Sequence, residues 1–134
     1  MERILIIGAN GQIGSELVEA LALQHGAQNV IASDIGATNV YKAARYTQLD
    51  VLDRAGLAKF VADEGITQVY QLAALLSATG EQAPLKAWTL NMDGLLNILE
   101  VARERGEAGK PLRIRLAAPT GKAAARLTES ISAQ

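Results

Sequence analysis

The stretch "RILIIGANGQIG", residues 3–14, joins a short apolar run to a turn with three glycines. Four apolar residues in succession at 4–7 are typical of a strand that is buried on both faces of a parallel sheet. After the glycines, apolar residues recur at helical spacing until Gly26, which is a common helix stop. The stretch therefore predicts a strand (3–8), a tight turn and a helix (11–26), the first unit of an α/β domain.

The three glycines, Gly8, Gly11 and Gly14, have the spacing G-x-x-G-x-x-G. In nucleotide-binding turns the first permits the tight turn, the second lets the backbone approach a pyrophosphate, and the third lets the helix pack on the strand. The helix N-terminus adds unpaired N–H groups. Asp34 closes the next predicted strand, where a carboxylate accepts ribose hydroxyls and disfavours a 2′-phosphate. The pattern predicts an NAD site; glycines chosen only for tight packing are the alternative.

The rest of the chain alternates between strand and helix patterns. Strands are predicted at 29–34, 45–50, 68–74 and 112–118, and helices at 53–65, 84–105 and 120–131. This order predicts a three-layer, Rossmann-like, doubly wound parallel sheet of five strands, ordered 3-2-1-4-5, in a single α/β domain over 1–134. The third strand is the most polar and is expected near an edge. In the first helix, apolar residues recur at helical spacing at Ile13, Leu17 and Leu21, and in the second we expect Leu57, Phe60 and Val61 to point inward. The long helix carries an apolar stripe made of Leu85, Trp88, Met92, Leu95, Leu99 and Ala102.

Composition narrows the possible chemistry. The chain has 134 residues, about half of them apolar, and no cysteine, so disulfides and thiolate chemistry are excluded. With His25 as the single histidine, a zinc site or a Ser-His-Asp triad is not expected. No apolar run is long enough for a membrane span, and we expect a cytoplasmic protein. Net charge is −1, but residues 103–134 hold seven Lys/Arg against three Asp/Glu, which indicates either a basic contact surface or an ordinary solvated face.

Five segments carry a resemblance to a known family: "IIGANGQIGSELVEAL", "NVIASDI", "LDVLD", "VYQLAALLSATGE" and "PLKAWTLNMDGLLNILEVARE". Residues 2–106 resemble the N-terminal half of the extended short-chain dehydrogenase/reductase family, in particular its epimerase-type L-threonine 3-dehydrogenases. We therefore take 1–109 as a dehydrogenase-derived, NAD-binding portion.

The resemblance implies a role for individual residues. It implies a pyrophosphate site at Gly8, Gly11, Gln12, Ile13 and Gly14, an adenosine ribose site at Asp34 and Ile35, and an adenine site at Asp50 and Val51. It also implies that Leu72, Ala73 and Ala74 lie under the nicotinamide side, that Asn91 is structural, and that Ser77 is near the substrate. From the residues alone, Asp50 is equally a strand-end turn residue and Ser77 a loop cap.

The catalytic pair of that family, a tyrosine with a lysine four residues later, does not occur in this sequence. Tyr41, Tyr46 and Tyr70 are followed at that distance by Arg45, Asp50 and Ala74. Without this pair there is no candidate for the general acid–base step. We therefore expect weak NAD binding, no catalysis and no metal, with an NAD-dependent oxidoreductase as the alternative.

A second glycine turn lies in "RIRLAAPTGKAAARL", residues 113–127. It is not a Walker A loop, because Ala123 follows Lys122 where Ser or Thr is needed and Leu116 stands five residues before Gly121 in place of glycine. Residues 112–131 resemble motif Ia of the RecD-type superfamily 1 helicases, so we expect an engineered chimera in which 110–134 completes the sheet. A third hypothesis is weak nucleic-acid binding by Lys110, Arg113, Arg115, Lys122 and Arg126.

Overall fold

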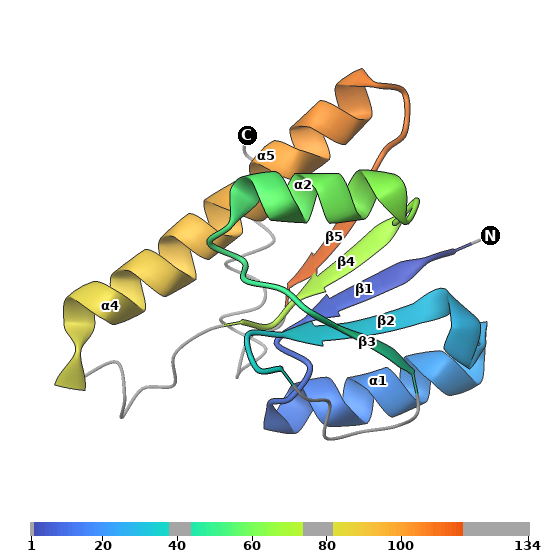
Figure 1. Ribbon diagram of the computed structural model, residues 1–134, viewed down its shortest axis with the longest axis horizontal. Coiled ribbons are helices and arrows are strands. Elements are labelled where there is room, and N and C mark those ends of the chain that lie inside the picture. Colours follow the sequence, from blue (N-terminus) through green and yellow to red (C-terminus); the bar gives the residue numbers. More distant parts are fainter. Residues whose placement is uncertain (1, 38–43, 74–81, 117–134) are drawn as a thin grey trace.

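Five parallel strands form one sheet in the computed structural model, which describes residues 2–37, 44–73 and 82–116. The strand order is β3-β2-β1-β4-β5 (Figure 1). The strands are β1 (Ile4–Ile7), β2 (Val30–Asp34), β3 (Arg45–Gln48), β4 (Gln68–Gln71) and β5 (Arg113–Leu116). The predicted Rossmann-like α/β fold and its strand order are confirmed, with the polar third strand at one edge and β5 at the other.

Helices cover both faces of this sheet. Figure 1 shows α1 below the sheet and both α2 and α5 above it. The helical segments are α1 (Gln12–His25), η1 (Ala27–Asn29), α2 (Arg54–Asp63), α4 (Pro84–Trp88), η2 (Thr89–Asp93) and α5 (Gly94–Glu107). Each right-handed crossover of a parallel sheet has to carry the chain over one face, which is why the two halves place their helices on opposite sides.

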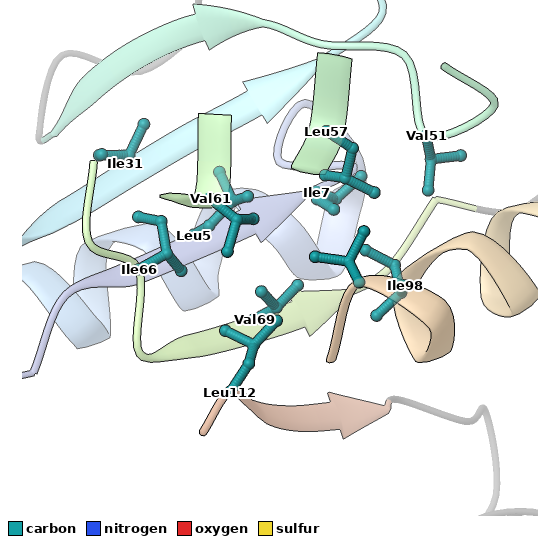
Figure 2. Close-up of a cluster of buried hydrophobic side chains, with 11 residues drawn as sticks. Leu5, Ile7, Ile31, Val51, Leu57, Val61, Ile66, Val69, Ile98 and Leu112 are labelled. Carbon is teal, nitrogen blue, oxygen red and sulfur yellow. The ribbon is translucent and has the colours of Figure 1, made fainter. Parts of the chain in front are cut away.

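The central strand β1 supplies the core of both layers, because its four side chains alternate between the faces and all are buried. Leu5 and Ile7 point to the α2 and α5 side, where they pack with Val69 and Ile98 (Figure 2). Ile4 and Ile6 point to the α1 side. Full burial of an aliphatic side chain contributes roughly 1.5–3 kcal/mol, so this short strand anchors much of the fold.

The long predicted helix is present but faces differently from the prediction. Its buried residues are Gly94, Ile98 and Val101, whereas Leu85 and Trp88 are 83% and 66% exposed. The segment η2 is a π-helical turn between α4 and α5. Figure 1 shows α4 extending past the carboxyl ends of the strands, so the apolar side chains of α4 do not meet the sheet. On α1, Ile13 begins the apolar row seen in the sequence but is 58% exposed, and the buried apolar residues of this helix are Val18 and Leu21.

Glu64, at the end of α2, ties three elements together. Its carboxylate accepts hydrogen bonds from both terminal nitrogens of Arg45, at 2.9 and 2.6 Å, and from Arg3 at 3.1 Å. Arg3 Nε also donates to the backbone carbonyl of Glu64 at 2.8 Å. The hydrogen bonds from Arg45, followed by the charges of Arg45 and Arg3, hold the pKa of Glu64 below its ordinary value.

We expect Leu57→Ala to lower the free energy of unfolding by about 2–5 kcal/mol, because Leu57 is fully buried under α2 and its loss leaves a cavity. The matched control is Leu23→Ala on α1, where the side chain is 91% exposed and the same substitution should change stability by less than about 0.5 kcal/mol. Urea denaturation measures both. Equal losses in the two variants would contradict this assignment of the core.

We expect Glu64→Gln to destabilise the protein at neutral pH and to have little effect in acid. A carboxyl with a lowered folded pKa stabilises the fold above its unfolded pKa, and this contribution is lost as pH falls through the folded pKa. The deficit in urea midpoint of the variant should therefore be larger at about pH 7 than at about pH 3. Glu19→Gln, an exposed position with no ion pair within the described residues, is the control. A Glu64→Gln deficit of the same size at both pH values would contradict the ion-pair role.

Candidate functional site

A pocket of about 270 Å³ lies at the carboxyl ends of β1, β2 and β4. β1 has β2 on one side and β4 on the other, so the connections that follow these strands run in opposite directions from this point. In open α/β sheets, ligands bind at such a switch point. The residues that line it are Ile7, Gly8, Gly11, Asp34, Ile35, Leu49, Asp50, Val51, Leu72, Ala73 and Leu90.

The glycine turn forms the base of this pocket. Different constraints require glycine at its three positions. Gly8 has φ +86°, and a Cβ there would lie 2.7 Å from the backbone nitrogen of Ala73. A Cβ on Gly14 would lie 2.5 Å from the carbonyl oxygen of Gly8. Gly11 is different: its φ is −76°, and a Cβ would meet only the Gly8 carbonyl oxygen, at 3.4 Å. Tight packing therefore explains Gly8 and Gly14, but leaves Gly11 to be explained by the pocket.

The N-terminus of α1 begins at this turn. Gly11 is the N-cap and has no side chain with which to cap the helix. The first N–H bonded within the helix is that of Ser15, which donates to the Gly11 carbonyl at 3.0 Å. Among the described residues, the N–H groups of Gln12, Ile13 and Gly14 make no hydrogen bond. These N–H groups and the helix dipole favour an anionic group at this end of α1.

Asp34, the last residue of β2, lines the pocket and is held in place by backbone amides. Its carboxylate accepts from the N–H of Asn10 at 2.9 Å and from the N–H of Ile35 at 2.8 Å. The hydroxyl of Tyr46 donates to the carbonyl of Gly36, which supports the segment after β2 from strand β3. Burial, with a smaller contribution from the charge of Asp34, raises the pKa of Tyr46, so this phenol stays protonated as a donor.

Asp50 combines the two roles that the sequence left open. It lines the pocket, and its side chain accepts from the N–H of Leu52 at 2.9 Å, as a turn residue does. The next residue, Val51, is 3% exposed and belongs to the core beneath the pocket (Figure 2). The segment after β3 is therefore both a structural turn and one wall of the pocket.

The structure brings together eight of the residues that the sequence singled out for a cofactor, namely Gly8, Gly11, Asp34, Ile35, Asp50, Val51, Leu72 and Ala73. Gln12, Ile13 and Gly14 do not line the pocket but form the first turn of α1 beside it. Asn91 lies exposed on η2, and Ala74 and Ser77 are outside the described residues.

Sequence reasoning missed three lining residues: Ile7, Leu49 and Leu90. Ile7 and Leu49 are immediate neighbours of predicted residues, so extending each motif by one position would have found them. Leu90 gives no such signal, because it reaches the pocket from the π-helical segment η2, and π-helical turns are frequent at functional sites.

The basic residues proposed for nucleic acid lie elsewhere. Lys110 and Arg113 border a second hollow, which Glu2 also lines, and Arg113 is paired with Glu2. Arg115 donates to the side chain of Gln68 at 3.4 Å, while Lys122 and Arg126 lie outside the described residues. In the part of the chain that the structure describes, no cluster of His, Asp and Glu is arranged to hold a metal, and no helix is long and apolar enough to cross a membrane.

Comparison with known proteins gives a consistent result. Residues 4–116 match the NAD dependent epimerase/dehydratase family. An uncharacterized epimerase/dehydratase of Staphylococcus saprophyticus is 46% identical over 107 residues, which are 78% of this chain and 33% of that protein. Among solved structures, a GalE-like L-threonine dehydrogenase from Cupriavidus necator in its holo form has 57% identity and a TM-score of 0.75, over 78% of this chain and 34% of that one. L-threonine dehydrogenase from Clostridium difficile has 39% identity and a TM-score of 0.78, over 87% and 36%.

The expectation that this chain is not an enzyme is wrong. It is overturned by the epimerase/dehydratase match and by the solved dehydrogenases. The expectation rested on the missing Tyr-x-x-x-Lys pair, but the chain spans about a third of the length of the curated relatives it matches. The absence of two residues from such a span does not exclude catalysis.

The expected chimera is not supported either. The family match runs to residue 116 and so includes β5, whereas the helicase-like part was expected to begin at 110. β5 pairs with β4 in parallel, from Gln68 with Arg113 to Gln71 with Leu116, as the fifth strand of a Rossmann-like sheet should. The rest of the helicase-like stretch, from residue 117, lies outside the described residues.

We expect Gly14→Ala to destabilise the fold strongly and Gly11→Ala to cost less than about 1 kcal/mol, since at the N-cap alanine is only a poorer capping residue than glycine. The new Cβ at position 14 would clash with the backbone of Gly8 and Ala9 and separate α1 from the turn, at a cost of roughly 1–3 kcal/mol. The same methyl at position 11 meets only ordinary contact distances. Urea denaturation of the two variants checks this. A large loss at Gly11→Ala would show that this glycine too serves packing.

Proposed function

This chain belongs to the NAD dependent epimerase/dehydratase family, and we propose that its residues 4–116 form the NAD-binding part of a dehydrogenase. The observation that carries the proposal is the combination of an open glycine, Gly11, with the unpaired N–H groups of the first turn of α1. A dinucleotide needs both, because its pyrophosphate has to approach the backbone closely and to meet hydrogen-bond donors there.

Each part of the pocket has a task in this proposal. The first turn of α1 binds the pyrophosphate through backbone N–H groups. Asp34 accepts the hydroxyls of the adenosine ribose, and its negative charge, with the neutral Ile35 beside it, selects against a 2′-phosphate. Asp50 and Val51 border the adenine. Gln12, Ile13 and Gly14 take part through their backbone, which agrees with their position beside the pocket.

The size of the pocket agrees with part of a dinucleotide. At about 270 Å³ it lies just below the range of roughly 300–1,000 Å³ that is usual for ligand sites. Most lining residues come from the carboxyl end of β1, which is the position proposed for the pyrophosphate, and from those of β2 and β3, which are the positions proposed for adenosine. Leu72 and Ala73, after β4, extend the lining toward the side proposed for the nicotinamide.

We propose L-threonine as the substrate of the whole enzyme. NAD, when bound, supplies the acceptor for the hydride that leaves an oxidised secondary alcohol. This chain's described residues bind and orient the nucleotide, and none of them is assigned the proton transfer. The support for L-threonine is the 57% and 39% identity with dehydrogenases of that amino acid. NADH formation with L-threonine would favour this substrate, whereas turnover of a nucleotide sugar would favour epimerase chemistry; a cytoplasmic location stays a prediction.

Binding of NAD and NADP to the chain, measured by calorimetry, tests the proposal. The wild-type chain should bind NAD more tightly than NADP. In Asp34→Asn the preference for NAD should fall by about tenfold, or roughly 1.4 kcal/mol, because the charge that repels a 2′-phosphate is gone. The ratio of the two affinities cancels any general effect of the substitution on the fold.

The matched control is Asp63→Asn on α2, an exposed position outside the pocket, which should leave the ratio unchanged. If the wild-type protein binds neither dinucleotide, the proposed function is wrong. An unchanged ratio in Asp34→Asn would remove the role given to this carboxylate.

A further inference from the structure

One wall of the pocket is a short segment after β3 that hydrogen bonds hold at both ends. Where it starts, the N–H of Leu49 donates to the carbonyl of Asp34 at 2.9 Å. Where it ends, the N–H of Asp53 donates to the carbonyl of Asp50 at 3.0 Å. Between these points lies Val51, whose own carbonyl makes no backbone hydrogen bond within the described residues.

The helix α5 contacts Val51 at two places, although the residues are more than forty positions apart in the sequence. The side-chain amide of Asn97 donates to the Val51 carbonyl at 2.9 Å. One turn earlier on the helix, Gly94 leaves room for the Val51 side chain, since a Cβ at Gly94 would lie 3.0 Å from Val51 Cγ1. Ile98, next to Asn97, packs in the same buried cluster as Val51 (Figure 2).

We propose that Asn97 is a positioning residue for the nucleotide pocket, which it serves by fixing the Val51 carbonyl and with it the wall formed by Leu49, Asp50 and Val51. The inference rests on the proposed function, because it takes the ligand at this wall to be the adenosine end of NAD. Without the amide donor, a carbonyl next to a 3% exposed side chain would have no partner. The segment would then shift toward water to satisfy the carbonyl, and the spacing between Val51 and Asp34 across the pocket would change.

The helical segment that precedes α5 also supplies a lining residue. Leu90, on η2 immediately before α5, lines the pocket and packs against the cluster that contains Val51 and Ile98. Contacts from the consecutive helical segments η2 and α5 therefore hold the wall in place, in addition to the hydrogen bonds of the local turn. A substitution on α5 that leaves the turn sequence intact should still change the affinity for an adenine nucleotide.

The test measures binding of AMP and of NAD to Asn97→Leu, which keeps the size of the side chain and removes the donor. We expect both ligands to bind about three- to tenfold more weakly, because one carbonyl hydrogen bond is lost at the adenosine end that they share. Asn97→Gln, which keeps an amide donor, should retain more affinity than Asn97→Leu. Asn97→Ala provides a second variant without a donor should the leucine fail to fold.

Val101→Ala is the matched control, because it removes buried methyl groups from the same helix and touches no hydrogen bond of the wall. Urea denaturation shows which variants are folded and how much stability each has lost. Affinity that falls in Asn97→Leu and not in Val101→Ala supports the positioning role. Wild-type affinity for AMP in Asn97→Leu, or an equal loss in Val101→Ala, overturns it. If the wild-type chain binds neither AMP nor NAD, the proposed function itself fails, which is a different outcome.

Discussion

The close approach of three backbone segments at Gly8 is the constraint on which the rest of the structure depends. The end of β1 runs against the end of β4 on one side and against the first turn of α1 on the other, at distances where no Cβ fits. Because these contacts are between backbone atoms, they cannot be relieved by moving a side chain. They fix where α1 begins, how it lies on the sheet, and how far β4 stands from the turn. The pocket is the space that this arrangement leaves open above Gly11.

Local patterns were sufficient to predict the fold, because each unit of strand, turn and helix is formed by consecutive residues with a recognisable pattern. The four apolar residues of β1, the three glycines of the turn and the polar third strand all have local signals. Eight of the residues that the glycine motif and the family resemblance singled out line one pocket, while their roles toward a cofactor stay predictions. What sequence reasoning missed depends on long-range packing. The placement of whole helices determines that Ile13 and Trp88 are exposed and that Leu90 reaches the pocket from a π-helical turn. A local sequence pattern does not predict these features.

The functional errors have a different origin. The absence of the Tyr-x-x-x-Lys pair was read as the loss of catalysis, although the relatives that match this chain are about three times as long. The likeness of residues 112–131 to a helicase motif led to the expectation of a chimera, but the family match continues through β5 to residue 116. In both cases a short motif was given more weight than the architecture around it, and a strand–helix unit is common to many α/β folds.

Both outer strands of the sheet carry arginine: Arg45 begins β3, and Arg113 and Arg115 alternate along β5. Arg45 and Arg113 are each about half exposed and paired with a glutamate from another element, so their guanidinium groups are kept at the two edges. A strand from a neighbouring molecule that extended the sheet would have to displace these ion pairs and strip water from the charges. Within the described residues, arginine on both outer strands therefore disfavours the pairing of these edges with a strand from a neighbouring molecule.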